Sequence, residues 1–216
     1  MNKNKICFIL CANQERYFQE CLLYINELLI PEEFEVEVLS IQDAKSMTAG
    51  YNEGMQSSDA KYKVYLHQDV FLVNRNFIFD ILKIFSDETI GMIGMVGTPK
   101  MPESCIMWDD TRVGRIYSSN LFLAGPSVIG EIREEYAQVE AVDGLLMVTQ
   151  YDIPWREDLF QKWDFYDISQ SYEFRKKGYK VVVPNIVIPW CIHDDGVMNL
   201  ENYYDERRKF IAEYRG

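Results

Sequence analysis

The chain has 216 residues, of which 48% are hydrophobic, 14% aromatic and 26% charged, and its formal net charge is −12. This balance is typical of a globular protein with enough apolar material for one large domain, and it excludes an intrinsically disordered chain. The surplus of carboxylates argues against nucleic acid as the main partner, because clustered Lys and Arg bind phosphate backbones. It still allows one small anionic ligand held by a metal ion or by backbone N–H groups.

The five cysteines are scattered, odd in number and without a CxxC pair. They favour reduced thiols in a cytosolic protein over a disulfide framework or a zinc knuckle. The first apolar run, ICFIL, is too short to cross a membrane and is followed by no signal-cleavage pattern. We therefore expect it to be a core strand.

Apolar and amphipathic segments alternate along the first hundred residues. Four strands are expected, over residues 6–10, 34–41, 62–66 and 90–97. Three helices are expected between them, over residues 15–30, 46–55 and 76–85, the first of them ended by Pro31. This order predicts a doubly wound α/β domain whose parallel sheet is covered by helices on both faces.

The pattern weakens over residues 98–140, where Gly, Pro, Ser and charges surround isolated aromatics such as Trp108. A partly irregular insertion that lines the site is expected there. A strand pattern returns in VEAVDGLLMVTQ, and KWDFYDISQSYEFRKKGYKVVVP indicates a helix followed by a strand. The last segment, LENYYDERRKFIAEYRG, is expected to be an amphipathic helix that caps the sheet or contacts a second copy of the chain.

Polar side chains follow three of the expected strands: Asn13, Asp43 and the tripeptide His67-Gln68-Asp69. Ligands of doubly wound sheets bind outside the carboxyl ends of the strands, so these residues are candidate site residues. Ordinary loop polarity would produce the same pattern.

The two histidines of the chain both follow apolar strands and precede acids. An extended backbone points His67 and Asp69 the same way, and imidazole nitrogen with carboxylate oxygen suits a divalent transition ion. Asp69 alone would suit Mg²⁺ or Mn²⁺ held mostly by water and a diphosphate. The alternative is a histidine that caps a strand and an aspartate that starts a turn. The question is whether His193, in WCIHDDG, meets the other two.

The segment around WDFYDIS places acids at the start of a helix. Asp164 is expected at the N-cap and Gly178 just past the helix end, with Asp167 in the first turn. There Asp167 either favours the helix dipole or acts as a general base at the edge of a pocket. In AVDGLLMV, Asp143 and the glycine after it either let a ligand approach the backbone or form a plain turn.

Common catalytic motifs are absent: the chain has no P-loop, GxGxxG, GxSxG, HExxH or zinc-finger spacing. A hydrolase triad is disfavoured as well, because both histidines are needed elsewhere.

Together these segments resemble the nucleotide-sugar-dependent glycosyltransferases of the GT-A fold, in particular the large inverting family two and its compact bacterial relatives. The similarity covers nearly the whole chain and is most specific in AVDGLLMV and WDFYDISQSYEFRKKGYKVVVP. It implies one GT-A domain over residues 1–216 with a mixed, mostly parallel central sheet. Its parts would be a nucleotide-binding half over residues 1–97, the insertion over 98–140, and an acceptor-side half with the C-terminal helix over 141–216.

The resemblance also implies residue roles. Asp167, eleven residues before Gly178, matches the catalytic aspartate. Asp69 matches the second acid of the family's Asp-x-Asp metal motif, and His193 the histidine that often completes the metal site. His67 stands where the first Asp is usual, an exchange that also occurs in other GT-A enzymes and alters the metal preference.

Further residues follow from the same resemblance. Asn13 and Asp43 would line the pocket for the nucleotide, with Asn52 as a third donor-binding residue. Asp143 and Asp164 would bind the acceptor or the sugar. A second departure is Tyr166, which stands where the acidic pair usually has Glu.

The activity implied is transfer of a sugar from a nucleotide-sugar donor to a glycan or other hydroxyl acceptor, with inversion and with Mn²⁺ or Mg²⁺ as cofactor. A nucleotidylyltransferase and a non-catalytic sugar- or nucleotide-binding protein of the same fold stay open as alternatives. The relatives also imply peripheral association at the inner membrane face of a protein whose cysteines favour the cytoplasm. The C-terminal helix leaves a homodimer as a further expectation.

Overall fold

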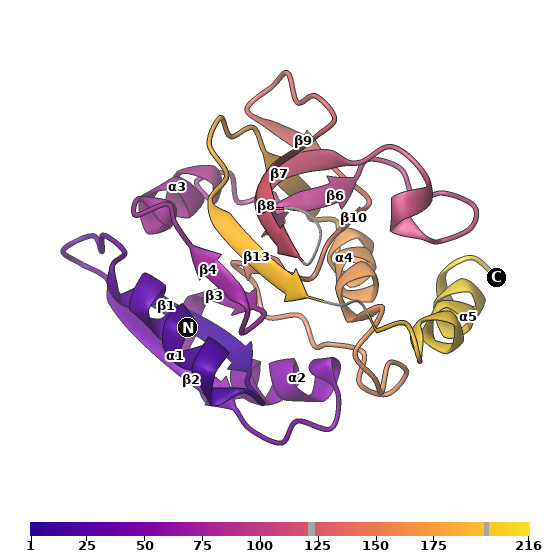
Figure 1. The fold of residues 1–216 in the computed structure, drawn as a ribbon, viewed down its shortest axis with the longest axis horizontal. Coiled ribbons are helices and arrows are strands. Elements are labelled where there is room, and N and C mark those ends of the chain that lie inside the picture. Colours follow the sequence, from indigo (N-terminus) through magenta and orange to yellow (C-terminus); the bar gives the residue numbers. More distant parts are fainter. Residues whose placement is uncertain (121–123, 197–198) are drawn as a thin grey trace.

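The computed structural model describes residues 1–120, 124–196 and 199–216 and combines two β-sheets with helices (Figure 1). The helices are α1 (Glu15–Asn26), α2 (Met47–Ser57), α3 (Phe77–Ile84), α4 (Tyr166–Lys176) and α5 (Tyr203–Tyr214), with a 3-10 turn, η1, over Met107–Asp109. Within the described ranges, none of the helices has the length and apolar character needed to cross a membrane.

The larger sheet has seven strands in the order β2-β1-β3-β11-β5-β12-β9. Their bounds are β1 (Asn2–Cys11), β2 (Glu35–Ile41), β3 (Ala60–Leu66), β5 (Ile90–Gly94), β9 (Tyr136–Gln138), β11 (Leu146–Thr149) and β12 (Lys180–Pro184). β1 runs parallel to β2 and β3, and β12 runs parallel to β5. β11 is antiparallel to both β3 and β5, so these two are parallel to each other, and β9 is antiparallel to β12. The predicted mostly parallel sheet is confirmed, and it is mixed.

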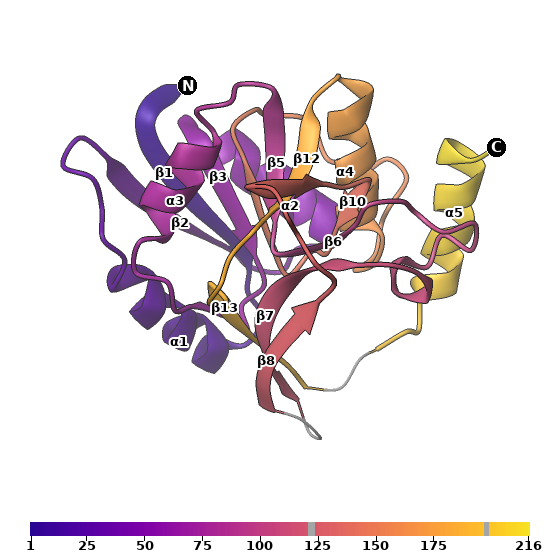
Figure 2. The same ribbon diagram turned by 90° about the horizontal axis from the view of Figure 1, so that it is seen from above.

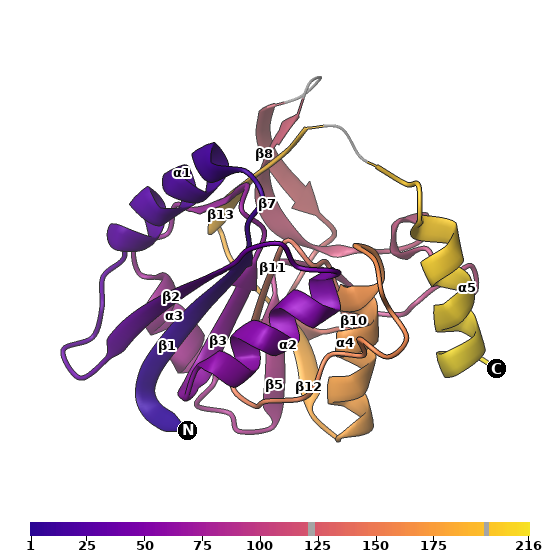
Figure 3. The same ribbon diagram turned by 90° about the horizontal axis from the view of Figure 1, so that it is seen from below.

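Helices cover both faces of this sheet, as predicted. Alternate residues of a strand face opposite sides, so Phe8 of β1 belongs to the core beneath α1 and α3, whereas Ile9 belongs to the core beneath α2 and α4. Figure 3 shows α2 and α4 in front of the strands with α3 behind them, and Figure 2 shows α3 in front. The strands are buried on both sides, which explains their continuous apolar runs.

The second sheet lies at the carboxyl edge of the first. It has the order β10-β6-β7-β13-β4, with β8 paired to β7. Its strands are β4 (Val70–Leu72), β6 (Val96–Thr98), β7 (Val113–Asn120), β8 (Ala124–Ile129), β10 (Ala141–Val142) and β13 (Cys191–Gly196). β4 and β6 directly follow β3 and β5 along the chain, which places the second sheet where ligands of such folds bind.

Three sequence expectations need correction here. The single strand over residues 90–97 is broken at Met95 into β5 and β6, because the two halves pair in different sheets. The insertion over residues 98–140 is more regular than expected, since it contains β7, β8 and β9. The first helix ends at Asn26, well before Pro31, because the backbone N–H of Leu29 donates to the carbonyl of Arg75, 2.8 Å away, instead of to its own helix.

The C-terminal helix caps α4. Phe210 is fully buried, and its ring centroid lies 5.6 Å from that of Phe165 and 5.0 Å from that of Tyr172. α5 therefore shields apolar side chains of α4 and of the residue before it, and covers a helix where a cap on the sheet was expected.

Candidate functional site

The turn between β3 and β4 is formed by His67, Gln68 and Asp69. The N–H of His67 donates to the carbonyl of Leu145 at 3.0 Å, and the N–H of Val70 donates to the carbonyl of His67 at 3.2 Å. This tight turn is bonded to the residue that precedes β11, and the His67 and Asp69 side chains stay partly exposed, each to 26%.

β13 brings the second histidine to this turn. β13 pairs antiparallel with β4 so that His193 lies opposite Val70, and the N–H of Asp194 donates to the carbonyl of Asp69 at 3.0 Å. His193 Nε2 is 3.8 Å from Asp69 Oδ1, and His67 Nδ1 is 3.9 Å from the same oxygen. The two imidazoles and the carboxylate meet as predicted, within 4.8 Å of one another.

The three side chains fit a divalent cation. Ligand atoms of one ion bound at about 2.1 Å are expected to lie about 3 to 4 Å apart, and Asp69 Oδ1 lies 3.8 Å from His193 Nε2 and 3.9 Å from His67 Nδ1. Asp69 Oδ1 is buried and accepts no hydrogen bond from the described residues. A bound cation would supply the partner that this buried oxygen lacks. Burial, followed by the charge of His193, lowers the pKa of His67 to about 4, which keeps its imidazole neutral and able to ligate.

Tyr166, at the start of α4, contacts Nε2 of the His67 ring. Its buried hydroxyl is hydrogen-bonded to His67 Nε2, whereas Nδ1 of the same ring faces Asp69. Gly144 leaves the space for the phenol, since a Cβ at that position would collide with the Tyr166 hydroxyl. The two departures from the family pattern, His67 and Tyr166, are thus direct neighbours in space.

Asp167 follows Tyr166 and contacts Gly144 as well, in the loop between β10 and β11. Its Oδ2 accepts a hydrogen bond of 2.9 Å from the N–H of Gly144, and its Oδ1 accepts one of 2.8 Å from the N–H of Ile168. Burial, followed by the charge of Asp143, raises the pKa of Asp167 from 3.8 to about 7. A carboxylate with a pKa near neutrality is suited to general base catalysis.

Asp143 precedes Gly144 in the loop between β10 and β11. One of its oxygens, Oδ1, accepts a hydrogen bond of 3.0 Å from the N–H of Leu145. The carboxylate borders a pocket next to β7, so a small ligand there would meet it.

The strand-end residues Asn13 and Asp43 follow β1 and β2. These strands lie on one side of β3, and β11 lies on the other. Gln68, the middle residue of the tripeptide, accepts hydrogen bonds from the N–H groups of Asn13 at 3.0 Å and Gln14 at 2.9 Å, and its Nε2 donates to Asn13 Oδ1 at 2.6 Å. Asp43 follows β2 in the left-handed conformation, with φ 54°, and is exposed. Gln68 therefore joins the end of β1 to the β3–β4 turn, which carries the candidate metal ligands His67 and Asp69.

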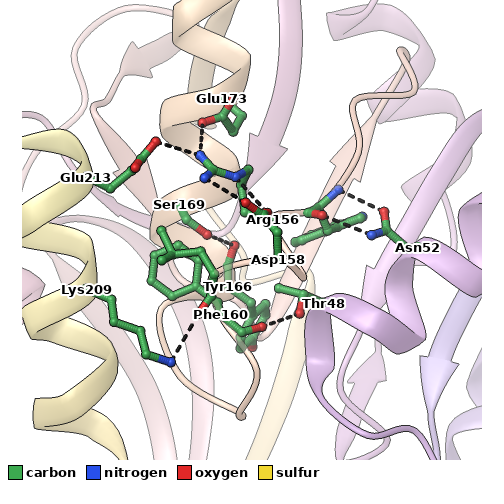
Figure 4. Close-up of polar contacts among 12 residues, drawn as sticks. Thr48, Asn52, Arg156, Asp158, Phe160, Tyr166, Ser169, Glu173, Lys209 and Glu213 are labelled. Atoms are coloured by element: carbon green, nitrogen blue, oxygen red, sulfur yellow. Dashed lines mark hydrogen bonds and ion pairs between the residues drawn. The ribbon is translucent and has the colours of Figure 1, made fainter.

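Asn52 is placed differently from the expectation. It is buried on α2, its Nδ2 donates to the carbonyl of Trp155 at 2.9 Å, and its Oδ1 accepts from the N–H of Trp155 at 2.8 Å (Figure 4). Two further contacts hold the same segment before α4. The Thr48 hydroxyl donates to the carbonyl of Phe160, and Arg156 forms ion pairs with Glu173 of α4 and Glu213 of α5. Asn52 thus holds the segment before α4 in place, and we do not carry it forward as a donor-binding residue.

Asp164 is not the N-cap of α4. The helix begins at Tyr166, and the N-cap is Phe165, which has a φ of 60° and makes no side-chain cap bond. Asp164 lies toward α5, where burial, followed by the charge of Glu206, raises its pKa to about 6. The other end of the helix is as predicted, with Gly178 in the left-handed conformation at φ 86°.

Sequence reasoning missed two residues of this site. Tyr166 was noted only as a departure, although a tyrosine next to the candidate base could have been paired with the unusual histidine. Gln68 is a candidate only as part of the tripeptide, and the alternation of an extended strand indicates no more than that its side chain points away from His67 and Asp69.

Solved structures of similar fold are glycosyltransferases. A mannosyltransferase from Pyrobaculum calidifontis in complex with GDP-Man and Mn²⁺ matches all of this chain with 13% identity and a TM-score of 0.61. S. aureus TarS matches 97% of it with 11% identity and a TM-score of 0.60, and GalNAc-T7 with UDP, GalNAc and Mn²⁺ matches 93% with 10% identity and a TM-score of 0.60. These are GT-A glycosyltransferases, so the GT-A fold expected from the sequence is confirmed.

The chain corresponds to only part of each of these structures. The chain spans 65%, 39% and 45% of the three structures in that order. A search among curated proteins finds no match. The sequence itself is matched over residues 7–214 by the model of a family described as glycosyltransferase like, and the protein therefore belongs to that glycosyltransferase-like family.

Proposed function

We propose that this protein transfers a sugar from a nucleotide-diphosphate donor to a hydroxyl group of an acceptor, with inversion at the anomeric carbon and with a divalent metal ion. The observation that carries the proposal is the meeting of His67, Asp69 and His193 beside Asp167. Tyr166 contacts His67 and is followed directly by Asp167, so a cation site and a candidate base border the same loop.

His67, Asp69 and His193 are the residues that would hold the metal. A bound divalent ion would neutralise the negative charge that builds on the departing diphosphate. Two imidazole nitrogens and one carboxylate oxygen favour Mn²⁺ over Mg²⁺, because Mg²⁺ prefers oxygen ligands. When His67 Nε2 carries the ring proton and donates it to the Tyr166 hydroxyl, the Nδ1 lone pair is left for the metal.

The nucleotide is proposed to lie on the Asn13 side of the β3–β4 turn. Asn13 and Asp43 follow the adjacent parallel strands β1 and β2, and their exposed polar groups are suited to a nucleobase and a ribose. Gln68 supports this side by fixing the chain that leaves β1.

Asp167 is proposed to act as the general base. Its carboxylate takes the proton of the acceptor hydroxyl while the acceptor oxygen forms a bond to the anomeric carbon. At the same time the bond from that carbon to the diphosphate oxygen breaks, and the electron pair leaves with the diphosphate. One displacement of this kind inverts the anomeric centre. Asp143, next to Gly144, is placed to orient the acceptor or the sugar.

A panel of nucleotide sugars tests the proposal. Binding is measured as a Mn²⁺-dependent thermal shift, and transfer as release of the nucleoside diphosphate with formation of a glycoside. Asp167→Asn should lower the rate of transfer by about 10²- to 10⁴-fold and leave donor binding largely unchanged. Asp205→Asn is the matched control, because Asp205 is also an acid in the first turn of a helix but is exposed on α5.

The alternatives predict different results. Transfer that persists in Asp167→Asn would show that the assigned base is wrong. Donor binding without transfer to any acceptor would favour a non-catalytic binding protein, and joining of a nucleoside triphosphate to a sugar phosphate would favour a nucleotidylyltransferase.

A further inference from the structure

β7 and β8 form a wall of a pocket of about 510 Å³. The residues that line it include Val96, Trp108, Arg112, Ile116, Ser118 and Asp143. This volume lies within the range of small-molecule sites, and the lining combines apolar side chains with a few polar groups, as such sites do.

Strand pairing places this pocket next to the candidate metal site. β7 runs parallel to β13 with Ser118 opposite His193, so the two side chains stand on the same face of the sheet. Asp143 borders the pocket from the loop whose Gly144 N–H binds Asp167. Asn13, bonded to Gln68, lies on the opposite side of the β3–β4 turn. The pocket therefore lies where an acceptor would face a donor held on the Asn13 side.

Trp108 and Arg112 give this pocket a specific chemistry. The indole of Trp108 is 39% exposed, and the guanidinium carbon of Arg112 lies 5.5 Å from its ring centroid. Arg112 is partly buried, and no carboxylate of the described residues forms an ion pair with it, whereas Arg156 and Arg175 both do. In a chain with a net charge of −12, a pocket guanidinium without such a partner is suited to an anion that arrives with the ligand.

We propose that this pocket is the acceptor site and that it selects a sugar that carries an anionic substituent, a carboxylate or a phosphate. The apolar face of the sugar ring stacks on Trp108, the anion binds Arg112, and the reacting hydroxyl points toward Asp143 and Asp167. The inference rests on the proposed function, because it names the acceptor class of that same site.

The test compares charged and neutral sugars in pairs. Saturation-transfer NMR measures binding of methyl glucuronide against methyl glucoside, and of glucose 6-phosphate against glucose. The charged member of at least one pair should bind about tenfold more tightly, as expected of one charge-assisted contact. Arg112→Gln should remove this preference, and Trp108→Ala should weaken both members of the pair. The pair that shows the preference tells a carboxylate from a phosphate.

Arg115→Gln provides the matched control. Arg115 lies on β7, three residues after Arg112, and its Nη1 donates to the carbonyl of Val187 at 3.2 Å outside the pocket, so the preference should persist in that variant. The inference is overturned if charged and neutral sugars bind alike, if no sugar of either pair binds, or if Arg112→Gln keeps the preference at an unchanged melting temperature.

The outcome separates this inference from the proposed function. If no nucleotide sugar binds or reacts while Arg112 still discriminates between charged and neutral sugars, the transferase proposal fails and the anionic-sugar pocket stands. If nucleotide sugars bind and react without any such discrimination, the transferase proposal stands and this inference fails.

Discussion

Asp167→Asn should change the pH dependence of stability as well as activity. Burial, followed by the charge of Asp143, raises the pKa of Asp167 from 3.8 to about 7, so the folded protein favours the protonated acid. A group whose pKa is raised by folding stabilises the protein below its unfolded pKa, and this contribution is lost as the pH rises to the folded pKa. Wild type should therefore lose stability from this group between about pH 4 and pH 7, and the amide variant should not.

The size of the effect follows from the two pKa values. The difference between 3.8 and about 7 corresponds to roughly 4 kcal/mol, at about 1.4 kcal/mol per pKa unit. Roughly two thirds of it falls between about pH 5 and pH 8, and partial exposure of the carboxylate reduces that share to about 1 to 2 kcal/mol. The amide keeps one acceptor for Gly144 but loses the bond from Ile168, a cost of about 1 kcal/mol at every pH.

Urea denaturation at about pH 5 and about pH 8 measures this difference. Asp167→Asn should be about 1 kcal/mol less stable than wild type at the lower pH, and this difference should shift in favour of the variant by about 1 to 2 kcal/mol at the higher pH. The exposed Asp43→Asn serves as the control and should run parallel to wild type. Parallel curves for Asp167→Asn as well would refute a raised pKa at this position and weaken its assignment as the base.

The remaining predictions concern the metal site and the loop before α4. Mn²⁺ should raise the melting temperature more than Mg²⁺ does, and His193→Ala should abolish the Mn²⁺ effect; an equal response to both ions would contradict the nitrogen-rich ligand set. Tyr166→Phe should weaken Mn²⁺ affinity, measured by calorimetry, by about 10- to 100-fold, because His67 loses the hydrogen bond that orients it; unchanged affinity would make the phenol a packing group only. Asn52→Ala should lower the free energy of unfolding by about 2 kcal/mol, since both backbone groups of Trp155 lose their partner; a variant as stable as wild type would show that the clamp contributes little.

Local sequence patterns by themselves determined most of the larger sheet. The strand near the N-terminus and those that end at Ile41 and Leu66 are continuous or alternating apolar runs, and α2 and α3 follow helical spacing within two residues of the expected bounds. Such patterns are set by the chain's own periodicity, which a sequence displays directly. The expectation that His67 and Asp69 face the same way rests on strand alternation, but the structure places both in the turn after β3, so the turn brings them together.

Only the tertiary structure decided which distant residues meet. Pairing of β13 with β4 brings His193 to the turn, and pairing in two different sheets breaks the strand over residues 90–97; both depend on contacts between segments far apart in the chain. The contact of Tyr166 with His67 and that of Asn52 with Trp155 also join segments far apart in the chain. The Asn52 side chain is suited to a ligand, but it binds the backbone of Trp155 instead. A sequence shows which side chains are suited to a ligand, but their partners depend on long-range packing, which has no local pattern.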